Sequence, residues 1–352
     1  MKQLKVDQLE PDMILAESVY SASGKVLLAE GTKLTPDLIK RLMEMQVPRV
    51  CVNDENTIPI DPNEVLTNRV HTQALRILGT VIPADLCGSR LEDAQFRYEL
   101  VAETIAKIME TKEVHELFLD LRTIDDDTLD HSITVCVLSL IVGAALKFTP
   151  DRLYMLGIGA MVHDIGKKAV PPEILAKRED LTPQETEIFQ AHVKEGYRIL
   201  REHGFDVPIA KVALYHHERW NGSGYVNRLA GDNIDIFSRI VQTADVYDDL
   251  IRGLTYKQKY LPHEAMEYLY GAGNFYFDVR VVKAFTSSIS AYPLGSLVKL
   301  STGEIGVVVN VQKTSAPRPI VKICYDKNNN RLDYPRQIDL SEEKTIFITK
   351  IL

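Results

Sequence analysis

The stretch Met161-Val162-His163-Asp164-Ile165-Gly166-Lys167 decides the predicted fold. It places an adjacent His-Asp pair at the polar end of an apolar helix, predicted over residues 151–163, with a lysine three residues after the aspartate. Side chains three apart on a helix share a face, so Asp164 and Lys167 can point the same way. Six of the nine histidines lie between positions 131 and 217, where further predicted helices would bring them to this pair.

Helical periodicity continues on both sides of this stretch. It predicts an all-α domain over residues 94–290, preceded by a linker and connecting helix over residues 56–93. Loops rich in Gly, Pro and Asp are expected over 164–183 and 218–233. The individual helices are expected near residues 65–80, 94–111, 127–147, 151–163, 184–203, 208–217, 234–251, 262–270 and 278–290.

Smaller modules are predicted at both ends of the chain. Residues 1–55 alternate strand-like runs with a helix that starts at Thr35-Pro36, which predicts a small α+β accessory module. Residues 291–352 hold four or five short β-type runs separated by turns, which predicts a small β-barrel. The expected fold is therefore multidomain, an all-α helical domain flanked by these two modules.

Composition limits the classes of partner. The chain has 352 residues, 45% hydrophobic and 26% charged, with a formal net charge of -8, so overall charge does not attract it to nucleic acid. The C-terminal runs carry no basic-aromatic stripe, and no DNA partner is expected. The apolar run Val135–Leu146 is shorter than the roughly 20 residues that span a bilayer. Four scattered cysteines without a CxxC pair fit a reducing compartment, which predicts a cytoplasmic protein without a membrane segment.

The candidate metal site combines imidazoles and carboxylates, ligands that suit Zn, Fe and Mn. Seven ligands exceed what one ion needs, so we expect two ions with Asp164 between them. Two ions about 3.5–4 Å apart can polarise a phosphoryl oxygen and hold a bridging hydroxide as nucleophile. Lys167 would neutralise developing charge or protonate the leaving group. The candidate ligands are His131, His163, Asp164, His192, His216, His217 and Asp245.

These motifs together resemble the HD-GYP subgroup of the HD-domain metal-dependent phosphohydrolases, over roughly residues 95–290. The resemblance rests on His163-Asp164-Ile165-Gly166-Lys167, His192, His216-His217-Glu218-Arg219, Gly222-Ser223-Gly224-Tyr225 and Ala244-Asp245-Val246-Tyr247-Asp248. It implies an HD-type helical fold and a phosphodiesterase that hydrolyses cyclic di-GMP to pGpG, GMP or both.

The resemblance also implies roles for individual residues. One ion, Fe or Mn, would be held by His131, His163, Asp164 and Asp245, and a second by Asp164, His192, His216 and His217. Some members bind a third ion through a glutamate one helical turn before the first histidine, and Asp127 stands there, one methylene shorter. The positions where members contact the nucleotide are taken by Asp125, Tyr225 and Lys257.

The chain departs from the family pattern in the segments that contact the nucleotide. The Gly-Tyr-Pro signature is Gly224-Tyr225-Val226, and Asn221 stands where Asp is usual. Leu254 and Thr255 replace an Arg-Pro pair whose arginine contacts phosphate, with Arg252 as a nearby substitute. Two alternatives therefore stay open: a degenerate module that binds cyclic di-GMP or a partner protein without turnover, and an HD hydrolase for another nucleotide or phosphoester. Signalling proteins that bind the terminal modules, and a homodimer, are the further partners considered.

Overall fold

The structure, a computed structural model, divides into two compact units, Met1–Asn68 and Arg69–Leu352. The residues it describes are 2–6, 9–16, 19–20, 26–29, 31–44, 49–53, 67, 69–70, 72–74, 76–78, 91–122, 124, 126–177, 181–253, 259–292, 295–310 and 318–352.

The N-terminal unit combines short strands with one helix. Strand β5 (Arg49–Asn53) lies between β1 (Lys2–Lys5) and β2 (Ile14–Leu15) in an antiparallel sheet, and β3 (Val19–Tyr20) pairs with β4 (Val26–Leu28). The hydroxyl of Thr35 accepts a hydrogen bond from Leu38 N at the start of α1 (Pro36–Glu44), as expected of an N-cap residue before proline. A shared core of buried Val, Leu and Ile side chains joins α1 to the strands.

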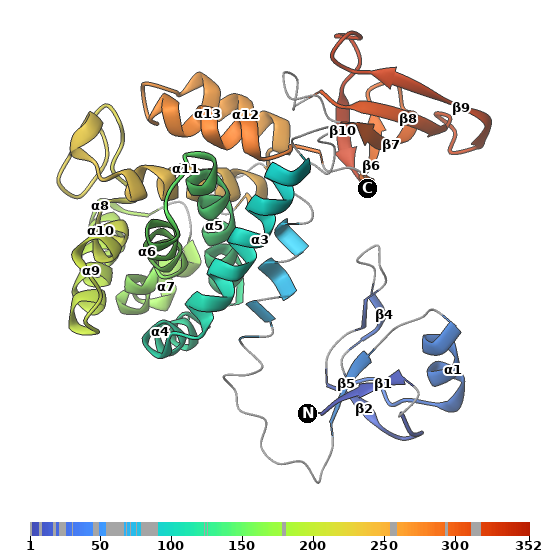
Figure 1. The fold of residues 1–352 in the computed structure, drawn as a ribbon, viewed down its shortest axis with the longest axis horizontal. Helices are drawn as coiled ribbons and strands as arrows, with labels where there is room; N and C mark the ends of the chain where they lie inside the picture. Colours follow the sequence, from blue (N-terminus) through green and yellow to red (C-terminus); the bar gives the residue numbers. More distant parts are fainter. Residues whose placement is uncertain are drawn as a thin grey trace. The chain divides into compact units, whose positions relative to one another are not determined.

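Helices fill most of the second unit, and the predicted all-α domain is confirmed there (Figure 1). The described residues between 67 and 78 are helical as well. The helices are α3 (Leu91–Met109), α4 (Lys112–Arg122), α5 (Asp126–Ala145), α6 (Pro150–Met161), the 3-10 turn η2 (Ile165–Ala169), α7 (Pro172–Lys177), α8 (Pro183–Gln190), α9 (His192–Glu202), α10 (Val207–Tyr215), η3 (Gly231–Asn233), α11 (Ile236–Arg252), α12 (Pro262–Gly271) and α13 (Val279–Ser288).

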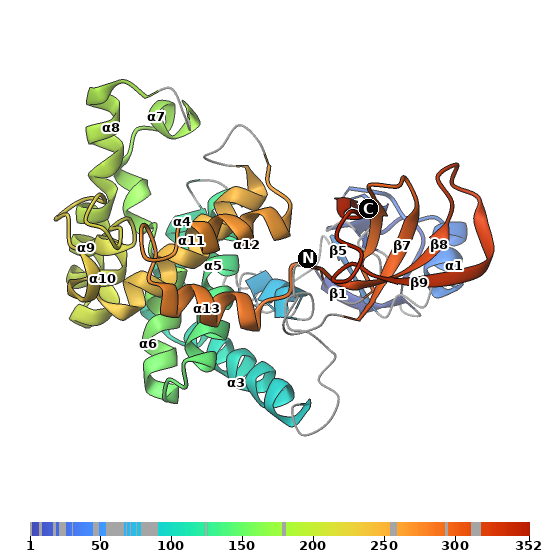
Figure 2. The same ribbon diagram turned by 90° about the horizontal axis from the view of Figure 1, so that it is seen from above.

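Helix α5 is the centre of this unit. It packs against α3, α4, α6, α11 and α13, and the second view shows it enclosed by other helices (Figure 2). Its side chains Ile133, Val137, Leu140 and Ile141 are buried, and each such burial contributes about 1.5–3 kcal/mol. Among the described helices, the stretch Asp127–Ala145 is long and apolar enough to cross a membrane, and 72% of it is buried inside this unit.

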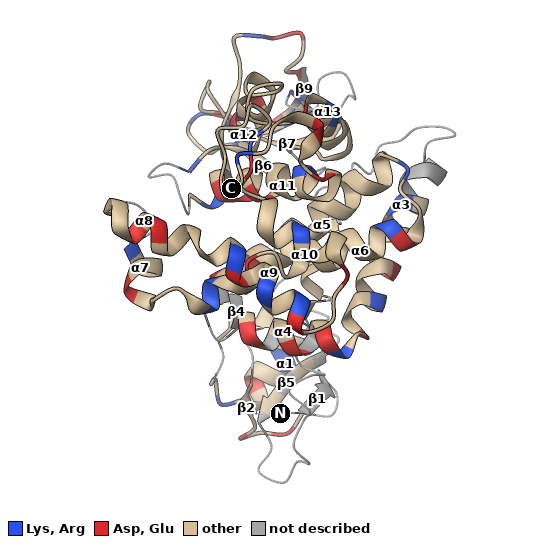
Figure 3. Ribbon diagram, turned by 90° about the vertical axis from the view of Figure 1, so that its left-hand side faces the viewer, with Lys and Arg blue, Asp and Glu red and all other residues tan. Residues whose placement is uncertain are grey.

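Three predictions about the helices are wrong. The helix α4 was not expected, although Val114, Leu117, Phe118 and Leu121 repeat at helical spacing and are buried. The single helix expected over 184–203 is two helices, α8 and α9, separated at Ala191. The loop expected over 164–183 contains η2 and α7. Charged residues of both signs lie along α9 (Figure 3), and Lys194, Arg198 and Arg201 among them are exposed.

The C-terminal strands form one antiparallel sheet. They are β6 (Leu297–Leu300), β7 (Ile305–Asn310), β8 (Ile320–Tyr325), β9 (Arg331–Asp339) and β10 (Ile348–Ile351), in the order β10-β6-β7-β8-β9. Within the described strands, β9 pairs only with β8 and β10 only with β6, so the sheet stays open. The predicted barrel closure is therefore not confirmed. Most of β9 is exposed, which suits an edge strand.

Candidate metal centre

Helix packing brings the candidate ligands to one point in the helical unit. His131 lies in the second turn of α5, and Asp245 lies in the middle of α11. The remaining ligands stand at helix ends: His163 and Asp164 directly after α6, His192 at the first position of α9, and His216 and His217 directly after α10.

Gly166 allows the His-Asp turn to lie directly on α9. A Cβ atom at this position would stand 1.9 Å from the main-chain oxygen of His192 and 2.5 Å from the nitrogen of Gly196. Any side chain would therefore push η2 away from α9. The glycine brings Asp164, two residues earlier, beside His192 at the start of that helix.

The ligand atoms form two clusters, each with all its atoms within 4.8 Å of one another. The first cluster is His131, His163 and Asp245, and the second cluster is Asp164, His192, His216 and His217.

Asp164 lies between the clusters. Its Oδ1 is 3.7 Å from the Nε2 atoms of both His192 and His216. Its Oδ2 is 3.4 Å from His163 Nε2 and 4.0 Å from His131 Nε2. Each carboxylate oxygen thus faces one cluster, which is the arrangement that a bridging ligand requires.

The polar atoms at the centre fit a bound metal. Five of them are buried without a hydrogen-bond partner in the described structure: Oδ1 of Asp164 and Nε2 of His163, His192, His216 and His217. Buried polar atoms without partners are costly and rare in proteins, so their convergence at one point indicates a ligand that satisfies them. Divalent ions supply that partner for imidazole and carboxylate together.

The ring orientations also fit metal binding. His163, His192 and His216 have their Nδ1 atoms 2.8, 2.6 and 3.0 Å from main-chain carbonyl oxygens three or four residues earlier. A carbonyl can only accept, so each ring carries a proton on Nδ1, and in its neutral form presents the Nε2 lone pair to the centre.

Electrostatics differ between the two clusters. In the second cluster, burial lowers the pKa of His192 to about 4 and that of His216 to about 3, and burial with the neighbouring imidazoles lowers the pKa of His217 well below its usual value. These rings are therefore neutral at pH 7, the form that binds a metal. In the first cluster, burial lowers the pKa of His163, but Asp164 and Asp245 outweigh it and raise the pKa to about 9.

The carboxylates of the centre stay ionised. Burial raises the pKa of Asp164, but Lys167 and His163 outweigh it and hold the pKa well below the usual value. Burial raises the pKa of Asp245 in the same way, but the hydrogen bond with His131 and the nearby imidazole of His163 outweigh it and hold the pKa well below the usual value.

Lys167 lies at the rim of the centre. Its Nζ donates a hydrogen bond of 2.5 Å to Asp164 Oδ2, and 22% of its side chain is exposed. Burial lowers the pKa of Lys167, but Asp164 outweighs burial and raises it above the usual value, so the side chain stays a cation. The carboxylate of Asp164 thus has a fixed positive charge beside it.

The loop after the His-His pair folds back onto the centre. Glu218 is fully buried, and its two oxygens accept hydrogen bonds from the main-chain nitrogens of Asn227 (2.6 Å) and Leu229 (3.0 Å). A Cβ atom at Gly224 would stand 2.5 Å or less from main-chain atoms of residues 217–219, so only glycine fits there. The ring of Tyr225 stacks on His217, with centroids 4.8 Å apart. Glu218 was not predicted as a site residue, and only its place beside the His-His pair signals it.

The two clusters do not account for every predicted site residue. Asp125 and Lys257, with Leu254 and Thr255, lie outside the described residues. Asp127 is exposed on the first turn of α5, and the described residues show no third ligand cluster around it. Its main-chain oxygen is 3.4 Å from Nη1 of Arg252.

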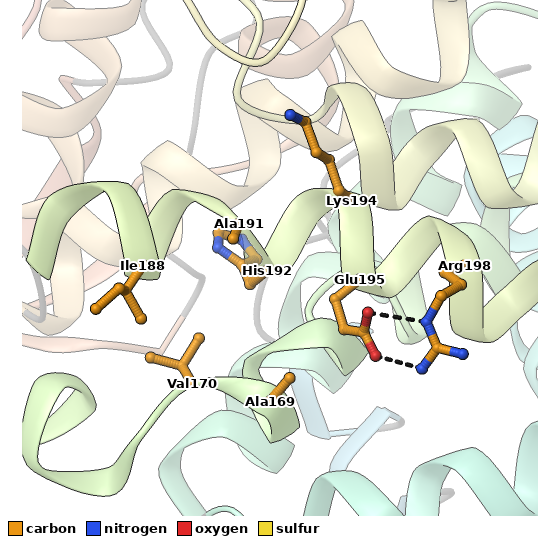
Figure 4. A pocket seen from close by; sticks show the side chains of 8 residues that line it. All are labelled: Ala169, Val170, Ile188, Ala191, His192, Lys194, Glu195 and Arg198. Carbon is orange, nitrogen blue, oxygen red and sulfur yellow. Dashed lines mark hydrogen bonds and ion pairs between the residues drawn. The ribbon is translucent and has the colours of Figure 1, made fainter. Parts of the chain in front are cut away.

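A pocket of about 340 Å³ adjoins the second cluster (Figure 4). Ala169, Val170, Ile188 and Ala191 form its apolar side, and His192 also lines it. On the polar side, Glu195 and Arg198 are joined by two hydrogen bonds, and Lys194 points away from that pair.

Comparison with known families agrees with this geometry. The sequence matches the HD domain family over residues 103–281. The chain belongs to the HD domain family. Residues 297–352 match the KOW domain that is associated with HD domains. The resemblance to HD-domain phosphohydrolases that the motifs indicated is confirmed, and the helical unit is an HD-type domain.

Relatives of this HD domain include named phosphodiesterases. Cyclic di-GMP phosphodiesterase PA4108 of Pseudomonas aeruginosa is 31% identical over 247 residues, which cover 70% of this chain and 59% of that protein. 3'3'-cGAMP-specific phosphodiesterase 2 of Vibrio cholerae is 40% identical over 131 residues, 37% of this chain and 25% of that protein. The chain thus matches less than two thirds of either relative. Among solved structures, Bd1817, a HDG"Y"P protein from Bdellovibrio bacteriovorus, aligns with a TM-score of 0.43 and 17% identity over 81% of this chain and 97% of that one, too distant to support an argument.

Proposed function

We propose that this protein is a metal-dependent phosphodiesterase that hydrolyses cyclic di-GMP to pGpG, GMP or both. The observation that carries the proposal is the convergence of five buried, unpartnered ligand atoms on two sides of Asp164. The named activity of the Pseudomonas aeruginosa relative supports cyclic di-GMP as the substrate.

The two clusters support the predicted ligand sets. His131, His163, Asp164 and Asp245 would hold one divalent ion, and Asp164, His192, His216 and His217 would hold the other. When bound, two such ions supply Lewis acidity at a phosphoryl oxygen and make water a nucleophile near neutral pH. Fe and Mn are the ions that we propose, because the ligand set is rich in histidine with a bridging carboxylate.

The protein's own side chains would orient the nucleotide and stabilise negative charge on the phosphoryl oxygens. Asp164 presents one oxygen to each cluster, and Lys167 holds that carboxylate in place. Because the pKa of Lys167 is raised, the ammonium is a poor proton donor, and we favour the role of neutralising charge on the phosphoryl oxygens. Tyr225 would contact the nucleotide from its place on His217, and Asp125 and Lys257 keep the contacts implied by the family resemblance.

A second candidate substrate is 3'3'-cGAMP, because a phosphodiesterase named as specific for it is 40% identical to this chain over the matched segment. The two cyclic dinucleotides share the phosphodiester that the centre would cleave and differ in one base. The choice between them therefore depends on the segments that contact the bases, not on the metal ligands.

Several finer features of the protein complete the proposal. The domain limits that we propose are 1–55 for the accessory module, 56–93 for the linker and connecting helix, 94–290 for the catalytic domain and 291–352 for the C-terminal module. Signalling partners at the terminal modules, a homodimer, a third ion near Asp127 and the cytoplasmic location all stay predictions.

The test combines metal analysis with turnover. Protein purified anaerobically should contain about two Fe or Mn ions per chain and should hydrolyse cyclic di-GMP, with pGpG and GMP separated by chromatography and 3'3'-cGAMP assayed in parallel. Asp164→Ala should remove both the metal and the turnover. Metal content without turnover of either dinucleotide would refute the enzyme and favour a binding module.

Lys167 offers a sharper test with a matched control. Lys167→Met should lower kcat by about 100-fold, the loss expected for one stabilising group, with metal content unchanged. Lys168 is the adjacent lysine and pairs instead with Asp120 Oδ2 at 2.7 Å. Lys168→Met should therefore leave kcat near the wild-type value, and equal losses in both variants would contradict the assigned role.

A further inference from the structure

His131 has an unusual second partner among the candidate ligands. Nδ1 of His163, His192 and His216 donates to main-chain carbonyl oxygens three or four residues earlier. His131 Nδ1 instead lies 2.7 Å from Oδ2 of Asp248, a residue 117 positions away. Its Nε2 lies 3.0 Å from Oδ1 of Asp245, the ligand with which it shares the first cluster. One side of this ring thus faces the centre, and the other is held by a carboxylate.

Asp248 is itself held in place. Only 8% of its side chain is exposed, and its Oδ2 also lies 2.8 Å from Nε of Arg252, one turn later on α11. A buried carboxylate needs an opposite charge nearby, and Arg252 supplies it. Nη1 of the same arginine reaches the main-chain oxygen of Asp127 at the start of α5. Arg252 therefore fastens Asp248 to the helix that carries His131, and this engagement argues against Arg252 as a phosphate contact.

We propose that Asp248, held by Arg252, is a positioning residue that sets the metal affinity of the first cluster. A carboxylate that accepts from Nδ1 fixes the tautomer of the ring, leaves the Nε2 lone pair for the ion and increases the basicity of that ligand. In the second cluster, His192 and His216 take their ring orientation from main-chain carbonyls, and Asp248 contacts neither ring, so the same substitution should not affect that cluster. The inference rests on the proposed metal-dependent function but concerns binding of the ion rather than turnover.

The experiment measures Mn²⁺ binding by the EPR signal of the free ion in two backgrounds of the full chain. His192→Ala removes a ligand of the second cluster only, so the remaining tight binding reports the first cluster. His131→Ala does the reverse. Adding Asp248→Ala should weaken binding by about 10- to 100-fold in the His192→Ala background, and by less than about threefold in the His131→Ala background, where its partner ring is already gone.

Two further variants test whether the effect of Asp248 comes from its charge, from its hydrogen bond or from damage to the fold. Asp248→Asn keeps an acceptor oxygen without the charge, so its effect in the His192→Ala background should lie between wild type and Asp248→Ala. Asp278 is the matched control, a buried carboxylate that pairs with Arg239 and Arg280 at 2.7 Å and touches no ligand histidine. Asp278→Asn should leave both affinities unchanged. Thermal melting checks the fold of each variant, and His216→Ala replaces His192→Ala if the latter unfolds.

The outcomes decide the proposal. Selective weakening of the first cluster supports it. Unchanged binding in the His192→Ala background, equal weakening in both backgrounds, or the same loss from Asp278→Asn overturns it. Because the readout is Mn²⁺ binding, absence of cyclic dinucleotide turnover in the wild-type protein would refute the proposed function without affecting this result.

Discussion

Asp164→Asn should weaken metal binding at the two clusters to different extents. In the structure, Oδ2 of Asp164 accepts from the Lys167 ammonium, and Oδ1 faces the imidazoles of His192 and His216. Asparagine has one oxygen acceptor and one NH₂ donor, and a donor cannot face the lysine. The amide oxygen should therefore take the place of Oδ2 beside Lys167 and the first cluster, and the NH₂ group should face the second cluster.

The expected magnitudes follow from the number of ligands. Four-ligand structural zinc sites bind with about 10–16 kcal/mol, or about 3 kcal/mol for each ligand. The second cluster loses one ligand, which corresponds to weakening by roughly 150-fold. The first cluster keeps an oxygen but loses its charge, and because charge-assisted contacts are about twice as strong as neutral ones, we expect a loss of about 1.5 kcal/mol, or roughly tenfold.

Mn²⁺ titration of Asp164→Asn with the EPR readout tests this order, again in the His192→Ala and His131→Ala backgrounds. Asp164→Ala should abolish tight binding in both, and Asp245→Asn should weaken the first cluster alone. If Asp164→Asn weakens both clusters equally, or spares the second, then Asp164 does not present one oxygen to each cluster and the bridging assignment fails.

Three other variants or conditions probe the same centre. Mn²⁺ binding to the first cluster should strengthen by about tenfold per pH unit for each ring that must lose a proton, as pH rises toward 9. The pKa of His163 is raised to about 9, and burial lowers the pKa of His131, but Asp245 and Asp248 outweigh burial and raise that pKa well above its usual value. The second cluster, with the pKa of His216 lowered to about 3, should show no such rise over that range, and a flat profile for the first cluster would contradict the electrostatics. Glu218→Ala should raise KM about tenfold, the equivalent of one lost hydrogen bond to a charged group, with unchanged metal content, since the loop that carries Tyr225 loses two main-chain contacts; steady-state kinetics that show a fall in kcat alone would disprove this role. Asp127→Ala should retain two ions and most turnover, whereas loss of a third stoichiometric ion in metal analysis would show that the centre is trinuclear.

The periodic part of the sequence predicted the helical domain well where local signals are strong. Thr149-Pro150 marks the start of α6, and Gly253, with a φ of 65°, ends α11 one residue after Arg252. The break between α8 and α9 was missed because Ala191 is a good helix former, and no proline or glycine marks the break. The missed α4 does carry the helical pattern, so that error lies in the interpretation and not in the sequence.

The sequence by itself determined which side chains could serve as metal ligands. Adjacent His163-Asp164 and His216-His217 pairs, with Gly166 two residues after the aspartate, are local features whose chemistry does not depend on distant contacts. Their metal-binding role stays a prediction, but the residue types and spacings alone single them out. The family was recognisable on the same grounds.

Only the tertiary structure decided how close those ligands lie to one another and which other groups support them. His131 and Asp245 are 114 residues apart, and packing of α5 on α11 places Nε2 of one 3.0 Å from Oδ1 of the other. The same packing pairs His131 with Asp248, a partner that no local pattern indicates. Sequence periodicity tells which face of a helix is apolar, but the distance between two polar atoms depends on how the side chains of both helices interdigitate, and that is a property of the packed core.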